Sequence, residues 1–296
     1  MRNEILMEAE SILKERHEKL NENVRIARQK LMDNATFSAI SSALQKEIIE
    51  NAKKEAYGEK VDRKKENKLN DELKAYLHEK NIDLTEKFSC HLCDDSGYKD
   101  GKMCACLKKE ISALLFKESN FGNLVSFDDA KKSAPKEYQK LYDKMKEWCH
   151  SDFKKNLIFI AGKTGVGKTY LASAIAKELM DLGRIVKLVT AFQMSRDFKE
   201  YRFSYNEEIL NKYLSAEFLF IDDLGTETLY KNITVDLLFH VINERKNRKL
   251  CTILTSNLTL DEIYDRYDER IFSRIVDRTT SITINLTGLD LRTKKK

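Results

Sequence analysis

The sequence predicts an α/β fold with a five-stranded parallel sheet, preceded by a helical N-terminal region. Between residues 151 and 296, short apolar runs alternate with helical patterns, which is typical of parallel strands with helices on both faces. The first 80 residues contain one glycine and no proline, and their apolar residues recur every three or four positions, which indicates helices. The five expected strands are 157–161, 185–190, 217–222, 251–255 and 281–286.

The N-terminal region is expected to contain three helical stretches. The first carries an apolar stripe over residues 6–31, interrupted near Arg16 and His17, and the others cover 38–57 and 65–80. Charges are nearly balanced over residues 1–80, with 17 Lys and Arg against 16 Asp and Glu, so this is not a basic DNA-binding arm. It is either a solvated helical spacer or a protein-docking module, and the stripe favours docking because it needs a partner surface.

The length and composition set the broad class of the protein. A chain of 296 residues suggests about two domains. A net charge of +5 and a pI near 8.7 permit contact with nucleic acid without arguing for it. Because there is no apolar run of transmembrane length and no signal-peptide pattern, we expect a cytoplasmic protein with no membrane partner.

Four of the six cysteines crowd into residues 88–107: Cys90, Cys93, Cys104 and Cys106. The first pair has the gap of a zinc knuckle, and glycines between the pairs indicate a hairpin, so four thiolates can close around Zn²⁺. Because the second pair has a one-residue gap, His91 is an alternative ligand, and a redox dithiol or unrelated surface thiols are the other interpretations. Four protein ligands leave no open position, so zinc would serve folding or docking.

These features divide the chain into three parts. Residues 1–110 are expected to form a docking domain that contains the zinc-binding segment. Residues 111–150 are a linker and helical lead-in, broken near 121–123 and at Pro135, the only proline of the chain. Residues 151–296 are the expected nucleotide-binding domain.

A complete phosphate-binding loop lies between the strand 157–161 and a helical pattern. It comprises Gly162, Lys163, Thr164, Gly165, Val166, Gly167, Lys168 and Thr169. The glycines let backbone N–H groups point at phosphate oxygens, Lys168 can reach the β- and γ-phosphates, and the Thr169 hydroxyl can bind Mg²⁺. A chance glycine-rich turn is disfavoured by the strand–loop–helix context. The loop therefore predicts that the chain binds ATP with Mg²⁺.

The strand 217–222 ends in two carboxylates, the pattern of a Walker B element. Asp222 is expected to hold Mg²⁺ together with Thr169, and Asp223 to orient or deprotonate the attacking water. Glu227, four residues further on, is a rival for the water-activating role.

Two later elements complete the expected site. Asn257 follows the strand 251–255 and is expected to contact the γ-phosphate or the attacking water, because open α/β sheets bind ligands at the carboxyl ends of strands. Arg270 and Arg274 lie four residues apart on one helical face, where an arginine can neutralise charge on a phosphoryl group bound to a neighbouring subunit. An ion-paired surface helix is the alternative for the two arginines.

The phosphate-binding loop, the Walker B strand, the strand before Asn257 and the segment with two arginines follow one another in the order found in AAA+ ATPases, and together they resemble that family. The segments Ile221–Glu227, Thr255–Leu258 and Glu269–Ile275 resemble the replicative helicase loaders of the DnaC/DnaI type, and the resemblance covers residues 120–292. The cysteine segment is similar to that of loaders from Gram-positive bacteria and their phages. The resemblance implies an AAA+ P-loop domain without a full lid that hydrolyses ATP under stimulation by DNA or a partner.

The resemblance also implies partners and three arginine roles. It implies self-association through the ATPase domain, binding of the hexameric replicative DNA helicase, and placement of that helicase on single-stranded DNA. By the same resemblance, Arg270 is an arginine finger, Arg274 a second interface or nucleotide-sensing arginine, and Arg292 a terminal sensor arginine.

Contacts to single-stranded DNA are expected between Phe192 and Tyr205, where aromatic residues are interleaved with Lys and Arg. An ordinary amphipathic helix is the alternative there. Two other functions are weighed against the loader: a transposition helper ATPase of the IstB type, and an adaptor that binds ATP without turnover. The long cysteine-bearing N-terminus disfavours the first, and the intact catalytic residues disfavour the second.

Overall fold

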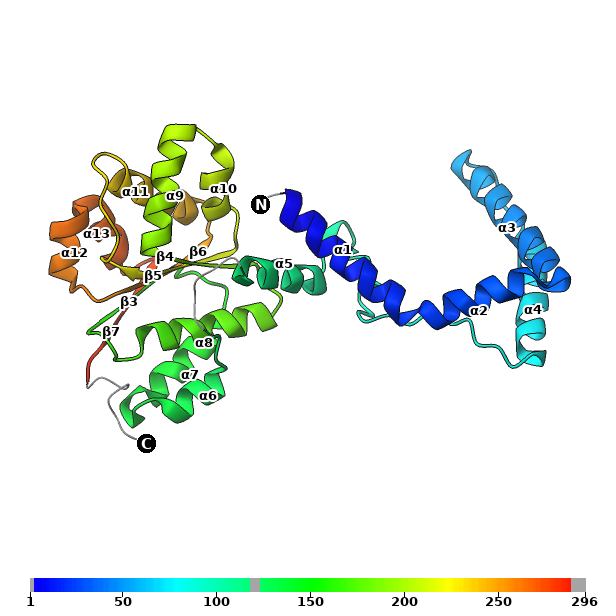
Figure 1. Ribbon diagram of the computed structural model, residues 1–296, viewed down its shortest axis with the longest axis horizontal. Helices are drawn as coiled ribbons and strands as arrows, with labels where there is room; N and C mark the ends of the chain where they lie inside the picture. Colours follow the sequence, from blue (N-terminus) through cyan, green and yellow to red (C-terminus); the bar gives the residue numbers. More distant parts are fainter. Residues whose placement is uncertain (1–2, 118–122, 289–296) are drawn as a thin grey trace. The chain divides into compact units, whose positions relative to one another are not determined.

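The computed structural model describes residues 3–117 and 123–288, which form two compact units (Figure 1). Leu13–Asp95 make up a helical unit. The second unit comprises the start of the first helix, up to Ile12, and the described residues from Ser96 onwards, which include the sheet. None of the helices in the described ranges is long and apolar enough to cross a membrane.

Four helices precede the cysteine segment in the described part of the chain: α1 (Asn3–Leu20), α2 (Glu22–Met32), α3 (Ala35–Ala56) and α4 (Lys64–Glu79). The first stretch, predicted as one helix, is therefore two helices, and the break between them falls at Asn21. Asn21 is buried, and its side-chain amide donates to the Lys87 carbonyl and accepts from the Lys87 N–H, both at 2.8 Å. The break depends on this contact with a residue that lies far away in the sequence.

Helices α3 and α4 pack against each other through rings and polar pairs. The Phe37 and Tyr76 rings have centroids 6.2 Å apart, and the Asn51 amide donates to Glu66 at 2.8 Å. On the outer side of α3, Ile48 and Ile49 are 45% and 49% exposed. The helical unit therefore keeps an apolar surface that its own residues do not cover.

The cysteine segment contains the predicted hairpin, with β1 (Tyr98–Lys99) paired antiparallel to β2 (Lys102–Met103). Its two turn residues, Asp100 and Gly101, have φ angles of 51° and 72°. Two positive φ values match the type I′ turn that joins tightly paired strands, and Asp-Gly suits that turn. Helix α5 (Ala105–Lys117) follows directly.

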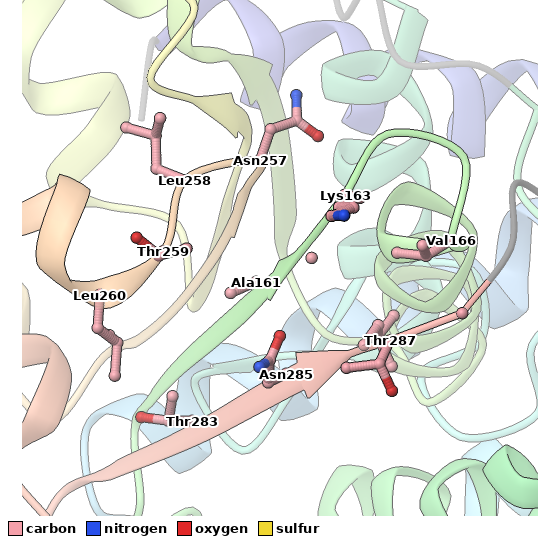
Figure 2. A pocket seen from close by; sticks show the side chains of 13 residues that line it. Ala161, Lys163, Val166, Asn257, Leu258, Thr259, Leu260, Thr283, Asn285 and Thr287 are labelled. Carbon is pink, nitrogen blue, oxygen red and sulfur yellow. The ribbon is translucent and has the colours of Figure 1, made fainter.

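The sheet has five parallel strands in the order β4-β5-β6-β3-β7, which confirms the predicted fold class. Strands β3 and β7 run side by side (Figure 2). The strands are β3 (Leu157–Gly162), β4 (Val186–Thr190), β5 (Phe218–Leu224), β6 (Cys251–Ser256) and β7 (Ser281–Leu286). The ends of all five strands lie within two residues of the expected ends. The agreement is close because strands of a parallel sheet with helices on both faces are nearly continuous runs of apolar residues, which are easily seen in the sequence.

Helices cover both faces of the sheet (Figure 1). One face carries α6 (Phe127–Ser133), α7 (Gln139–Cys149) and α8 (Lys168–Asp181), with a short 3₁₀ turn (Lys136–Tyr138) before α7. The other face carries α9 (Ala191–Ser204), α10 (Glu207–Leu214), α11 (Thr234–Asn247), α12 (Leu260–Tyr267) and α13 (Glu269–Val276).

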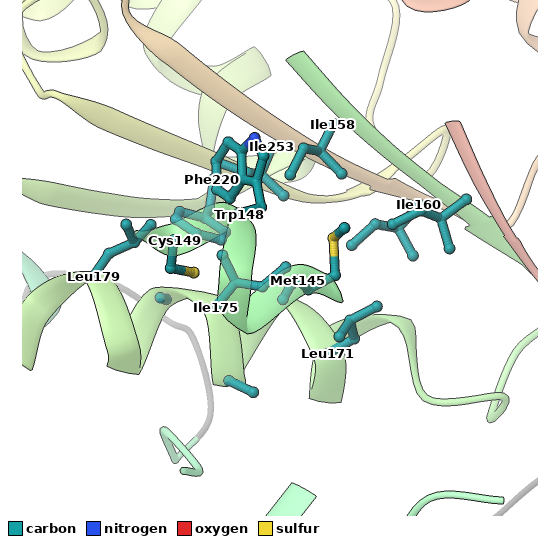
Figure 3. Packing of buried hydrophobic residues seen from close by; sticks show 14 of the residues in the cluster. Met145, Trp148, Cys149, Ile158, Ile160, Leu171, Ile175, Leu179, Phe220 and Ile253 are labelled. Carbon is teal, nitrogen blue, oxygen red and sulfur yellow. The ribbon is translucent and has the colours of Figure 1, made fainter. Parts of the chain in front are cut away.

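The apolar core on the α8 face is formed by side chains of α7, α8 and the sheet (Figure 3). The buried side chains there include Met145 and Trp148 of α7, Leu171 and Ile175 of α8, and Ile158 of β3. Helix α8 is therefore fixed against the sheet along its length. Since α8 begins at the phosphate-binding loop, this packing positions the loop.

Candidate nucleotide site and cysteine cluster

The phosphate-binding loop joins the end of β3 to the start of α8. Gly162 has a φ angle of 153°, and a Cβ atom there would lie 2.4 Å from the Leu286 carbonyl oxygen of β7. Gly167 has a φ angle of 101° and directly precedes Lys168, the first residue of α8. Both positions therefore require glycine, and together they turn the loop back onto the N-terminus of the helix.

Lys168 and Asn257 meet at this loop. The Lys168 side chain is buried, and its Nζ donates to the Asn257 Oδ1 at 2.5 Å and to the Lys163 carbonyl at 3.0 Å. The Thr164 hydroxyl lies 3.5 Å from the same Asn257 oxygen. The structure thus brings together the loop lysine and the polar residue after β6, because β6 pairs with β3.

Asp222 lies where a magnesium ion would be held. Thr169 Oγ1 lies 3.1 and 3.2 Å from the two Asp222 oxygens, and Thr255 Oγ1 donates to Asp222 Oδ1 at 2.5 Å. Burial raises the pKa of Asp222, as does the neighbouring Asp223 charge, against the opposing effects of Thr255, Thr169 and Lys168. A buried carboxylate beside a hydroxyl is a hard oxygen donor set that fits Mg²⁺.

Thr255 is a further site residue that is not among those predicted from the sequence. Besides donating to Asp222, its hydroxyl accepts the Asp223 backbone N–H at 2.9 Å. The signal in the sequence that could have identified it is a polar residue near the end of an apolar strand. In the structure that strand, β6, pairs with β5, which carries Asp222.

Asp223 has a different backbone conformation from Asp222. Its φ angle is 56°, and the pairing of β5 with β6 shifts between Ile221 and Leu224. A left-handed residue at such an irregularity turns its side chain away from the regular strand alternation. Two consecutive carboxylates can therefore serve separate functions, with Asp222 buried and Asp223 half-buried.

Glu227 is held away from solvent by partners of its own. Its carboxylate accepts the Gly225 N–H at 2.8 Å and the Tyr267 hydroxyl, and its side chain is fully buried. Both carboxylate oxygens thus have donors. This arrangement favours Asp223 over Glu227 as the carboxylate available to a water molecule.

Arg270 and Arg274 lie on α13 and contact residues of α11. Arg270 forms ion pairs with Asp268 at 2.7 Å and Asp236 at 3.0 Å, and Arg274 donates to Asn243 at 3.0 Å. Both guanidinium groups lie over the Phe239 ring, 5.0 and 5.6 Å from its centroid. Arg292 lies outside the described residues.

A pocket of about 560 Å³ lies beside the loop at the carboxyl ends of β3, β6 and β7 (Figure 2). Lys163 lines it from the loop, Asn257 from the end of β6, and Thr283 and Asn285 from β7. The open space thus lies at the same edge of the sheet as the residues predicted to contact phosphate.

The segment predicted to contact single-stranded DNA is helix α9. Phe198 is buried and packs against Tyr213, with ring centroids 5.5 Å apart, so it belongs to the core. Phe192, Arg196, Lys199 and Phe203 are exposed. Their spacing of four, three and four residues places these four side chains on one face of α9.

The four predicted cysteines come together in the cysteine segment. The Sγ atoms of Cys90, Cys93, Cys104 and Cys106 all lie within 4.8 Å of one another, and among the described residues this group does not include His91. Four clustered thiols fit a tetrahedral Zn²⁺ ion.

Asp95 organises the first half of the cysteine segment. Its buried carboxylate accepts the backbone N–H groups of Ser89 and Cys90 at 2.9 and 2.8 Å and lies 3.2 Å from Nδ1 of His17. Bonds of this kind fix the backbone that carries a metal ligand.

Comparison with known proteins adds relatives and a family. The chain is 29% identical to the replicative helicase loader DnaC of Escherichia coli (strain K12) over 120 residues, which cover 39% of this chain and 48% of DnaC. It is 27% identical to the phage-like element PBSX protein XkdC of Bacillus subtilis (strain 168), covering 68% of this chain and 84% of XkdC. A crystal structure of DnaI is similar over 52% of this chain and 84% of DnaI, at 27% identity and a TM-score of 0.42.

The chain spans about half the length of the DnaC helicase loaders that it matches. The model of the IstB-like ATP binding proteins matches residues 116–296, which include the loop, both Walker B carboxylates, Asn257 and the two α13 arginines. With this match over more than half of its length, the chain belongs to the family of IstB-like ATP-binding proteins.

Proposed function

We propose that this protein is an ATP-dependent loader that binds the hexameric replicative DNA helicase and helps to place it on single-stranded DNA. The ATP-binding family and the DnaC relatives support this proposal. The helical unit Leu13–Asp95 supports it further, because it supplies surface for a partner outside the unit that contains the sheet.

The observation that carries the ATPase proposal is the separation of two sets of residues. Lys168, Asp222 and Asn257 converge at the loop, whereas Arg270 is bonded to Asp236 and Asp268 on the α11–α13 surface. We infer that Arg270 completes the site of a neighbouring chain, as an arginine finger does, with Arg274 at the same interface. The isolated chain then hydrolyses ATP slowly, and assembly on DNA or helicase accelerates turnover.

Each residue at the loop has a role in this proposal. Lys168 binds the β- and γ-phosphates, and Thr169 and Asp222 hold Mg²⁺, which neutralises phosphate charge when bound. Asp223 accepts the proton of the attacking water, and Asn257 positions that water or the γ-phosphate. Asp223 has this role rather than Glu227, because the Glu227 oxygens already have donors.

We propose that the exposed face of α9 contacts single-stranded DNA. Phe192 and Phe203 suit stacking on bases, and Arg196 and Lys199 suit phosphate contacts. Replacing both phenylalanines by alanine should weaken stimulation of ATP hydrolysis by single-stranded DNA, while the rate without DNA stays the same. Undiminished stimulation would remove α9 from the DNA interface.

The N-terminal residues 1–110 are proposed to dock on the helicase, with Zn²⁺ bound by the four cysteines as a structural element. Four thiolates leave no coordination position for a substrate, so the ion stabilises the segment. Ile48 and Ile49 supply exposed apolar surface for docking. A redox function of the thiols is less well supported, because all four cluster as one ligand set.

Native mass spectrometry of the full chain mixed with the hexameric replicative helicase, in ATP and in ADP, tests the loader proposal. A stoichiometric, nucleotide-dependent complex is expected, and replacing Ile48 and Ile49 by serine should weaken it. Leu182→Ser, at a similarly exposed position in the other unit, is the matched control and should leave the complex intact. No complex in either nucleotide would favour the alternative, a transposition helper ATPase of the IstB type.

A further inference from the structure

The Glu227 carboxylate joins two elements that the proposed ATPase mechanism treats separately. One oxygen accepts the Gly225 N–H at 2.8 Å, in the turn after β5, and the other accepts the hydroxyl of Tyr267, the last residue of α12. Arg266 donates to the Glu227 carbonyl at 2.7 Å. The Glu227 side chain is fully buried, and the Arg266 guanidinium lies 3.9 Å from the oxygen that the Tyr267 hydroxyl contacts, so losing either hydrogen-bond donor would leave a buried carboxylate oxygen with fewer partners.

From Tyr267 the connection continues to Arg270. Asp268 follows Tyr267 with a φ angle of 85° and is the N-cap of α13. Its carboxylate accepts the Arg270 backbone N–H at 2.9 Å and the Arg270 guanidinium at 2.7 and 3.0 Å. The position of Arg270 therefore depends on the end of α12, which Glu227 holds.

On its other side, the turn 223–227 contacts the nucleotide site. The Asp223 carbonyl accepts the Thr226 hydroxyl at 2.8 Å, and the Leu224 carbonyl accepts the Ser256 hydroxyl at 2.5 Å. A Cβ atom at Gly225 would lie 2.7 Å from the side chain of Leu258, the residue after Asn257. A movement of the Walker B turn would thus reach Glu227 through bonded and packed neighbours.

We propose that Glu227 is a positioning residue that holds the Arg270-bearing end of α12 and α13 in register with the nucleotide site of its own chain. A subunit then presents Arg270 correctly to its neighbour only while this link is intact. The proposal rests on the proposed function, in which Arg270 acts on the ATP of a neighbouring chain. Glutamate is suited to the position because one carboxylate accepts two donors from opposite sides.

Two complementary variants distinguish the chain that supplies Arg270 from the neighbouring chain whose site receives it. An Asp223→Asn chain keeps Arg270 but cannot activate water, and an Arg270→Ala chain keeps the water-activating site but supplies no arginine. Each should be inactive alone with ATP and single-stranded DNA. A mixture should recover turnover, because the Arg270→Ala site can receive Arg270 from the Asp223→Asn chain.

Glu227→Gln is then placed in one chain of the mixture at a time. Gln keeps one acceptor oxygen and loses the other, so the link is weakened without a change of size. In the Asp223→Asn chain it should reduce the recovered turnover by about tenfold or more, since small misplacements of catalytic groups have effects of this order. In the Arg270→Ala chain it should leave the turnover within a factor of about two.

The two arms control each other for folding, because the same substitution is measured in both. Tyr267→Phe in the Asp223→Asn chain removes only the hydroxyl and should lower turnover in the same direction. A loss confined to the Arg270→Ala chain would assign Glu227 to water activation, and equal losses in both chains, or no loss in either, would also overturn the positioning role. If the mixture recovers no turnover with Glu227 intact, the proposed action of Arg270 on a neighbour fails instead.

Discussion

The nucleotide site and the α13 surface hold their charged side chains in different ways. At the loop, Lys168 and Asp222 are buried and bonded to other residues of the predicted motifs. On α13, Arg270 is 51% exposed and bonded to Asp236 of α11, outside any motif. Ion pairs between solvent-exposed side chains contribute little to stability, because both partners are well solvated when they separate. The first site is thus organised before a ligand arrives, whereas Arg270 can exchange its partners for a phosphate at low cost.

The largest expected effect concerns the α13 surface, where Arg270 can exchange its ion-pair partners. Arg270→Ala should lower DNA- or helicase-stimulated ATP turnover by about a thousandfold or more, because a finger arginine has effects of 10³–10⁵. ATP affinity should stay unchanged, since Arg270 is not bonded to the loop of its own chain. Steady-state turnover and nucleotide titration measure the two quantities.

A matched arginine controls for charge and surface exposure. Arg248 lies just after α11 and pairs with Glu244 at 2.7 Å, and Arg248→Ala should leave stimulated turnover unchanged. Equal losses in the Arg248 and Arg270 variants would mean that surface charge, rather than a specific finger, supports turnover.

At the nucleotide site, Lys168→Ala should weaken ATP binding by about 10- to 100-fold, which is the range for a lost hydrogen bond to a charged group. Lys177 on the same helix is half-buried and paired with Asp181, so Lys177→Ala is the control and should bind normally. Titration with a fluorescent ATP analogue compares them. Tight binding by the Lys168 variant would place the phosphates elsewhere.

The cysteine cluster resembles the nucleotide site in that hydrogen bonds from a buried carboxylate hold part of it in place, here the backbone at Ser89 and Cys90. Asp95→Asn removes an acceptor from the Ser89 and Cys90 N–H groups and should weaken zinc retention by about 10- to 100-fold, as loss of an outer-shell partner does. Competition with a chromogenic chelator measures retention, and Asp94→Asn, at an exposed neighbour, is the control. ATP binding should survive chelation, and its loss would couple the cysteine segment to the nucleotide site.

The smallest effect concerns the burial of Asp222. Since its pKa is raised in the folded state, the ionised carboxylate destabilises the ligand-free fold above that pKa, and the penalty disappears as the pH falls toward the ordinary Asp value. Asp222→Asn should therefore raise the melting temperature measured near pH 7 without nucleotide or Mg²⁺. A lower melting temperature at pH 7 would mean that the charge is well compensated in the free protein.

Much of the nucleotide site could be predicted because its signals are local. Gly162 and Gly167 have positive φ angles that strongly favour glycine, and the strand runs contain apolar residues on both faces. In contrast, the sequence did not indicate that Thr255 bonds Asp222, or that Phe198 is buried rather than exposed on α9. Such contacts depend on which strands and helices become neighbours.

By itself, the sequence determined the order of strands and helices along the chain, the phosphate-binding loop, the Walker B carboxylates and the cysteine set. Each is encoded by residues within about one element of each other, where backbone geometry and side-chain periodicity dictate the outcome. Only the tertiary structure decided the partners of Glu227, Arg270 and Asn21. Tyr267 lies 40 positions from Glu227, Asp236 lies 34 from Arg270, and Lys87 lies 66 from Asn21. Burial of a polar group requires a partner, but the fold alone determines which residue comes close enough to provide it.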